Sequence, residues 1–212
     1  MRRGQVLLAS TLGFGLLYLA ATATLGSPPG ADDSGAAVVG WFHDHGGHVR
    51  VWMWLLTLAT PLFAIFAVHV RARLPELHRD VFTFGAIAFA AETAIQGWIW
   101  VALAWRPDGL DPATARTLLD VASLWGPVLT STTVLTLGPI AVVGLRGIDG
   151  WPKWLGVLSG IALAEQLVET VTVMGRGGFF APGGPMNIYV GALLTAVAWL
   201  ATGIWAARTT PD

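Results

Sequence analysis

Long apolar runs alternate with short polar segments along the whole chain. Each run is about 20 residues long, the length that an α-helix needs to cross a hydrocarbon layer of ~30 Å. The runs cover residues 5–26, 49–70, 81–105, 121–145, 154–174 and 186–207. The pattern predicts an all-α integral membrane protein, a bundle of about six transmembrane helices in a single domain, residues 1–212.

The segments between these runs carry their own signals. Residues 36–42 read as a short interfacial helix that leads into the second span. Asp111 followed by Pro112 is an N-cap with proline at the first helical position. That helix starts amphipathic and passes into the fourth span, where Pro127 introduces a kink. Residues 175–185 are rich in glycine and proline and cannot form a regular helix; we expect a flexible outer loop, with a re-entrant cap as the alternative.

The orientation follows from the lysines and arginines near the ends of the spans. With the N-terminus inside, the cytoplasmic side carries Arg2, Arg3, Arg71, Arg73, Arg79, Arg146, Lys153 and Arg208. The outer side carries Arg50, Arg106, Arg116 and Arg176. We therefore expect both termini in the cytoplasm and a multi-pass protein of the cell membrane.

Composition narrows the function classes. Mean hydropathy is +0.63 and only 12% of the residues are charged, against about 25% in an average soluble protein. The net charge of −1 argues against a nucleic-acid partner. Because the chain has no cysteine, disulfides, thiolate metal sites, iron–sulfur clusters and a cysteine nucleophile are all excluded. Nucleotide-binding glycine loops, zinc-protease and serine-hydrolase motifs are missing too, and we expect no cofactor.

Carboxylates interrupt the apolar spans at a few places. Glu92, Gln96 and Trp100 recur every four residues and so share one helix face. A charge at mid-membrane costs roughly 2.5–3.5 kcal/mol on insertion scales, so such a residue is a functional-site hypothesis by default. Glu165 and Glu169 form a similar pair four residues apart, and Asp120 heads the fourth span. The candidate catalytic groups are Glu92, Gln96, Asp120, Glu165 and Glu169.

Aromatic residues gather in the outer halves of the same spans. The candidate substrate-binding residues are Trp52, Trp54, Trp98, Trp100, Trp125, Phe89 and His48. Together they predict an aromatic-walled cavity that contains acids. An acid buried without a lysine or arginine is expected to keep its proton, and the faces of aromatic rings attract a developing carbocation. The alternative is that the glutamates and glutamines only bond neighbouring helices.

The histidines do not form a convincing metal site. His45 and His48 are three residues apart, but Gly46 and Gly47 between them weaken a preformed helical site. A transmembrane haem needs axial histidines well inside facing spans, whereas these lie at span ends. We predict no metal.

Several segments together resemble a known group. They are residues 40–45, which read Gly-Trp-Phe-His-Asp-His, the pair Arg71 and Arg73, and the later segments 151–156 and 178–184. In their order they resemble a broad group of small actinobacterial multi-pass proteins. Proteins of this size and build are similar to the drimentine-type bacterial membrane terpene cyclases. That resemblance implies cyclisation of a prenylated aromatic substrate by protonation; it assigns no catalytic residue.

The leading hypothesis is therefore a metal-independent terpene cyclase embedded in the membrane. It protonates an alkene or epoxide of a lipophilic prenylated small molecule, which reaches the protein from the membrane lipid. The alternative is a proton-coupled transporter or a membrane protein that binds a lipophilic small molecule. A third reading is a subunit that scaffolds partners through its polar stripe. A transporter needs polar access from both faces, and the cytoplasmic halves of the spans lack it.

Overall fold

The computed structural model describes residues 3–210; Arg2, which contributes to the expected orientation, lies outside this range. The described chain is 86% helical and contains no strand. Six helical segments are long and apolar enough to cross a membrane, and they are Arg3–Leu25, Gly35–Arg71, Glu76–Trp105, Pro112–Arg146, Lys153–Met174 and Met186–Arg208. The prediction of an all-α bundle with about six such helices is confirmed.

Regular α-helix makes up most of these segments. The α-helices are α1 (Arg3–Leu25), α2 (Gly35–Arg71), α3 (Glu76–Trp105), α4 (Pro112–Ser123), α5 (Trp125–Arg146), α6 (Lys153–Glu169) and α7 (Ala192–Arg208). Short 3₁₀ turns lie between them: η1 (Pro107–Gly109), η2 (Ile148–Gly150), η3 (Thr170–Met174) and η4 (Gly178–Phe180). A π-helical turn, η5 (Met186–Gly191), opens the last span.

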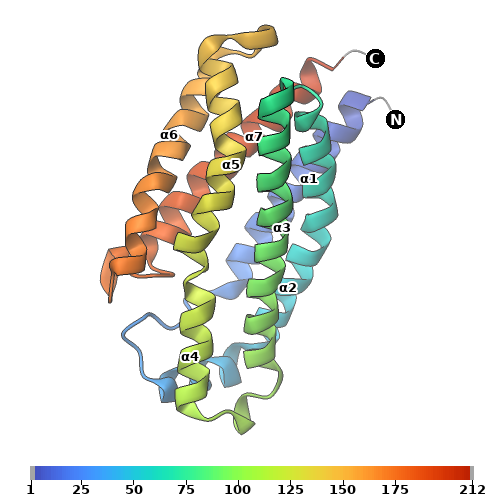
Figure 1. Ribbon diagram of the computed structural model, residues 1–212. Coiled ribbons are helices and arrows are strands. Elements are labelled where there is room, and N and C mark those ends of the chain that lie inside the picture. Colours follow the sequence, from blue (N-terminus) through green and yellow to red (C-terminus); the bar gives the residue numbers. More distant parts are fainter. Residues whose placement is uncertain (1–2, 211–212) are drawn as a thin grey trace.

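The helices run side by side as an elongated bundle (Figure 1). Helix α1 begins and α7 ends at the same end of the bundle, which we call the terminal end (Figure 1). The opposite end, called the loop end, carries α4 and the segments 26–34 and 106–111 (Figure 1). Helix α5 packs against both α3 and α6, while α1 packs against α2 and α7.

The expected interfacial helix is not a separate element. Residues 36–42 belong to α2, which continues unbroken from Gly35 to Arg71. Its N-terminus is capped by Ser34, whose Oγ accepts a hydrogen bond from the backbone N–H of Ala37 at 3.2 Å. Gly46 does not break the helix: a Cβ there would lie 3.1 Å from the backbone oxygen of Ala104. The glycine lets α2 approach α3.

The fourth span is interrupted where the proline predicts a kink. Helix α4 ends at Ser123 and α5 begins at Trp125. Pro127 has no N–H to donate to the carbonyl of Ser123 four residues earlier, so the helix cannot continue regularly through this position. The break turns Trp125 into the first residue of a new helix and places it inside the bundle's loop-end half.

Two groups of buried side chains hold the bundle together. The terminal half is filled by rings and branched side chains such as Phe63, Phe66 and Phe82. The loop-end half has a second group around Phe42 and Trp100. The space for a ligand lies beside and between these groups.

Candidate functional site

Two adjoining cavities lie in the loop-end half of the bundle. The larger, called the main cavity, has a volume of about 310 Å³, at the lower end of the range for small-molecule sites. Its walls are largely aromatic and aliphatic. The smaller, called the inner chamber, has a volume of about 30 Å³, enough for one or two water molecules. The two cavities adjoin, because both are lined by Tyr18, Phe89, Trp125, Ala192 and Ala196.

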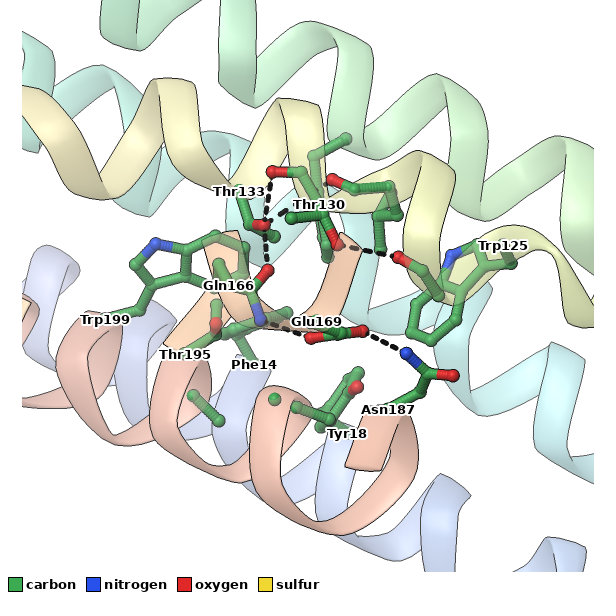
Figure 2. A pocket seen from close by; sticks show the side chains of 16 residues that line it. Phe14, Tyr18, Trp125, Thr130, Thr133, Gln166, Glu169, Asn187, Thr195 and Trp199 are labelled. Atoms are coloured by element: carbon green, nitrogen blue, oxygen red, sulfur yellow. Dashed lines mark hydrogen bonds between the residues drawn. The ribbon is translucent and has the colours of Figure 1, made fainter. Parts of the chain in front are cut away.

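Glu169 is the only carboxylate among the residues that line these two cavities. It is the last residue of α6 and is 4% exposed. Asn187 Nδ2 donates to its Oε1 at 2.6 Å, and Gln166 Nε2 donates to its Oε2 at 2.6 Å. Figure 2 shows this carboxylate held between the two amide groups. No lysine or arginine in the described chain forms an ion pair with it.

The amide groups are fixed by further hydrogen bonds. The side-chain oxygen of Gln166 accepts from the hydroxyl of Thr133 on α5. The side-chain oxygen of Asn187 accepts from the backbone N–H of Gly183 at 2.9 Å. Because both amide oxygens are already engaged, both NH₂ groups are turned toward Glu169. The orientation of the carboxylate is therefore set by α5 on one side and by the 175–185 segment on the other.

Local backbone features make room for this group. Asn187 and Gly191 both belong to the π-helical turn η5, a rare element that occurs frequently at functional sites. A Cβ at Gly191 would overlap Oε2 of Glu169, and a Cβ at Gly126 would overlap the side chain of Asn187. Two glycines on different helices thus provide the space that the carboxylate and its amide partner occupy.

Some of the residues that line the inner chamber carry polar atoms without a hydrogen-bond partner. Thr195 and Trp199 line it and are 4% and 3% exposed. Thr195 Oγ1, Trp199 Nε1 and Trp125 Nε1 are buried and have no hydrogen-bond partner in the described chain. A buried polar group without a partner costs about 1–3 kcal/mol.

The structure places some of the predicted catalytic residues at the cavities and others away from them. Glu92 lines neither cavity; its Oε2 accepts from the hydroxyl of Thr132 on α5 at 3.1 Å. Glu165 also lies outside the cavity walls and accepts from Gln166 Nε2 at 2.9 Å. Asp120 pairs with Arg116 at 2.5 Å on α4. Of the five candidates, Glu169 lines the inner chamber and Gln96 lines the main cavity.

Only part of the predicted aromatic wall lines the main cavity. Trp52, Trp100, Trp125 and Phe89 line the main cavity, and the rings of Trp52 and Trp100 are 5.6 Å apart. Trp54 and Trp98 point away from it and are 59% and 67% exposed. His48 is also exposed and outside the cavity, with its ring 5.8 Å from that of His45.

Four important residues were missed by the sequence analysis. They are Tyr18, Asn187, Thr195 and Trp199. The sequence held one signal for them, the polar side chain of Asn187 at the start of an apolar span. Tyr18 carried none, because an aromatic residue in a first span reads as ordinary membrane-facing sequence.

The segment 175–185 covers the loop-end side of the cavity. Pro182 and Gly183 line the main cavity, and Gly183 bonds Asn187 as described. The cap that we held as the alternative thus fits the structure better than a loop detached from the site.

The described residues contain no group of three or more histidine, cysteine, aspartate or glutamate side chains placed to hold a metal ion. His43 bonds Asp44 at 3.1 Å and lies 3.5 Å from Asp108, in an exposed position. These polar contacts lie at the surface of α2, away from both cavities.

Comparison of the chain with known protein families, with curated proteins and with solved structures gave no match. The site therefore has to be interpreted from its own chemistry.

Proposed function

We propose that this protein is a cell-membrane terpene cyclase that protonates an alkene or epoxide of a prenylated, meroterpenoid-type substrate. The observation that carries the proposal is a single buried carboxyl group, Glu169, beside a cavity walled by aromatic rings. In this proposal Glu169 takes the role of proton donor that the sequence pattern assigned first to Glu92. The terminal end of the bundle faces the cytoplasm, as the distribution of arginines indicates.

The reaction balances without a cofactor. The O–H bond of the Glu169 carboxyl breaks, and the π electrons of an alkene form a C–H bond with the proton. A second alkene attacks the resulting tertiary cation, which closes a ring through a new C–C bond. The Glu169 carboxylate then removes a proton from the final cation, and the product is an isomer of the substrate.

The walls supply stabilisation at the places where positive charge develops. Phe89 and Trp125 line both cavities, and Trp199 lines the inner chamber. The ring of Trp199 lies 4.8 Å from that of Phe89, edge to face. Contact between a cation and such faces is worth ~2 kcal/mol or more where water is excluded. Amide donors to Glu169 stabilise the carboxylate that remains after proton transfer.

The packing of the terminal half favours a one-sided pocket over a transport path. Phe63 lies 5.1 Å from Trp199, and Phe66 is 1% exposed. Between the cavity and the terminal end, these and other buried side chains fill the bundle. A proton-coupled transporter needs a polar route through this region. A protein that binds the same ligand without chemistry remains the competing proposal, and product analysis separates the two.

The test is mass spectrometry on membranes that contain the protein, incubated with farnesylated indole and with linear prenyl alcohols. The proposal predicts an isomer of unchanged mass and altered retention, absent from membranes without the protein. If folded protein binds these compounds but leaves them unchanged, binding without catalysis replaces the cyclase proposal.

A further inference from the structure

Helices α1 and α7 are in close contact toward the terminal end. A Cβ at Gly4 would lie 2.7 Å from the backbone oxygen of Ala207, and one at Gly15 would lie 2.6 Å from the side chain of Leu200. Gly203 in turn packs against Thr11. These tight contacts join residues 4–15 of α1 to residues 200–207 of α7, so small residues hold the helices together there.

Toward the loop end the main cavity separates the same two helices. Leu19, Thr22 and Leu25 of α1 line it from one side, while Ala192, Leu193 and Ala196 of α7 line it from the other. The helices therefore meet at the terminal end and enclose a cavity at the loop end.

Several of these lining residues also face the outside of the protein. Leu19 is 54% exposed, Leu193 is 56% exposed, and Tyr189 in the preceding π-helical turn is 63% exposed. Residues in the same cavity that belong to α2 and α3, such as Trp52 and Trp100, are 7% and 6% exposed. The cavity-lining residues with large exposed side chains therefore lie on α1, on α7 and in the turn before α7.

From these observations we propose a lateral opening for the substrate, bounded by Leu19, Tyr189 and Leu193. The apolar chain of an uncharged prenyl compound passes from the loop-end leaflet of the bilayer between α1 and α7 into the main cavity. This inference rests on the proposed function for the identity of the substrate. The route itself depends only on the cavity and on the two helices.

A further hollow next to the main cavity can hold the polar end of the substrate. A third hollow of about 530 Å³ lies between the segments 27–33 and 178–189, and it shares Pro28, Pro182 and Tyr189 with the main cavity. Asp32 and Asp33 line it, and none of its described lining residues is a lysine or arginine. Arg116 donates to the backbone oxygens of Gly30 and Asp33 beside this hollow, but its charge is already paired with Asp120. A phosphate or diphosphate head group would therefore meet mainly the like charge of Asp32 and Asp33. The surroundings accept a head group that is neutral.

The first experiment maps where such a compound touches the protein. A farnesol carrying a photoreactive diazirine is added to vesicles that contain the protein, and after irradiation the labelled residues are found by mass spectrometry. The proposal predicts labels on Leu19, Tyr189 and Leu193 that excess unlabelled farnesol removes. Labels confined to other membrane-facing residues, such as Ile87 on α3, would overturn it.

The second experiment uses the absence of native cysteine. In Leu193→Cys the single thiol is reacted with a bulky maleimide, and association of a dansyl-tagged farnesol is followed by energy transfer from the tryptophans. We expect modification to slow association several-fold relative to the unmodified variant. The matched control is Leu16→Cys, on a residue of α1 that is 67% exposed and does not line the cavity; its modification should leave association unchanged. Equal rates before and after modification at Leu193→Cys would contradict the proposed route.

The association rate measured in this experiment does not depend on whether the protein catalyses a reaction. It reports binding, so the access route fails if modification has no effect or if the photolabels lie elsewhere, whether or not any product forms. The cyclase proposal fails separately, if bound prenyl compounds form no isomer.

Discussion

The side-chain amide of Asn187 donates a hydrogen bond to Oε1 of Glu169 at 2.6 Å, from a π-helical turn to the end of α6. Asn187 is 1% exposed and Glu169 is 4% exposed. The contact joins the start of the last span to the only acid among the described residues that line the two cavities, and it fixes the position of that carboxyl group.

We predict that Asn187→Leu slows the reaction while the protein stays folded. Loss of a hydrogen bond to a charged group costs about 1.5–3 kcal/mol, which corresponds to about a 10- to 100-fold drop in kcat. Because Asn187 lines the inner chamber and not the main cavity, KM should change little. Steady-state kinetics on the purified protein measures both constants. A rise in KM at unchanged kcat would instead make Asn187 a substrate-binding residue.

Gly191→Ala should damage the site directly. The added methyl group would overlap Oε2 of Glu169 and lie 2.9 Å from Nε2 of Gln166. Overpacking of this kind costs about 1–3 kcal/mol, so we expect a lower thermal midpoint and a displaced, less active carboxyl group.

The control for this substitution is Gly160→Ala, in the middle of α6. A Cβ at Gly160 meets no atom within 4 Å, and alanine is favoured over glycine in a helix by about 1 kcal/mol. Gly160→Ala should keep full activity and equal or higher stability. If both variants lost activity alike, the contact between Gly191 and Glu169 would not be the cause.

Glu92→Gln should retain product formation. Its carboxyl lies between α3 and α5, where Thr132 donates to it, and the side-chain oxygen of glutamine can accept the same hydrogen bond. The expected result is normal folding and a turnover rate close to that of the unsubstituted protein, measured by product mass spectrometry. Complete loss of product would return Glu92 to the mechanism and contradict the placement of the acid at Glu169.

The N-cap of α4 predicts a pH dependence of stability. Hydrogen bonds from the backbone and side chain of Thr114 hold the pKa of Asp111 below its usual range. A carboxyl with a lowered pKa in the folded state stabilises the fold fully above the unfolded pKa, about 3.9, and loses this effect as pH falls through the folded value. Asp111→Asn keeps a capping side chain and serves as the control for Asp111→Ala. We expect Asp111→Ala to have a lower thermal midpoint than the original protein at neutral pH, with the difference shrinking in acid. A difference that is the same at every pH would rule out the charged cap.

The spans were predictable because membrane crossing depends on the length of an apolar run, which can be read directly from the sequence. The expected start of the first span at residue 5 and its end at residue 26 differ little from Arg3 and Leu25 of α1. The unbroken course of α2 was not predictable, because glycine can weaken a helix or let two helices come into contact. The sequence does not show which of the two effects applies. Only the position of Ala104 opposite Gly46 distinguishes them.

Helix geometry explains which aromatic residues reach the cavity. Successive residues of an α-helix point about 100° apart, so two tryptophans separated by one residue face nearly opposite directions. Trp98 and Trp100 are such a pair, and Trp100 alone lines the main cavity. The same geometry applies to Trp52 and Trp54. From the sequence, one member of each pair could have been assigned to the outside, but not which one.

The residues of the polar stripe on α3 do not all face the same direction, for a related reason. Residues four apart differ by about 40° in direction, so Glu92 and Trp100, eight apart, differ by about 80°. Trp100 faces the cavity and Glu92 faces α5. The partners of Glu169 were harder to foresee, since Asn187 reaches it only through a π-helical turn that no sequence pattern announced.

The most direct test of the account is to run the reaction on a linear prenyl alcohol in D₂O and to determine the mass of the cyclic product. A carboxyl group that exchanges with solvent transfers deuterium to carbon, so the product should be heavier than the undeuterated isomer by one mass unit per initiating protonation. Glu169→Gln should form no such product, although it still binds the substrate. An unlabelled isomer, or undiminished labelled product from Glu169→Gln, would contradict the claim that Glu169 starts the cyclisation by donating a proton.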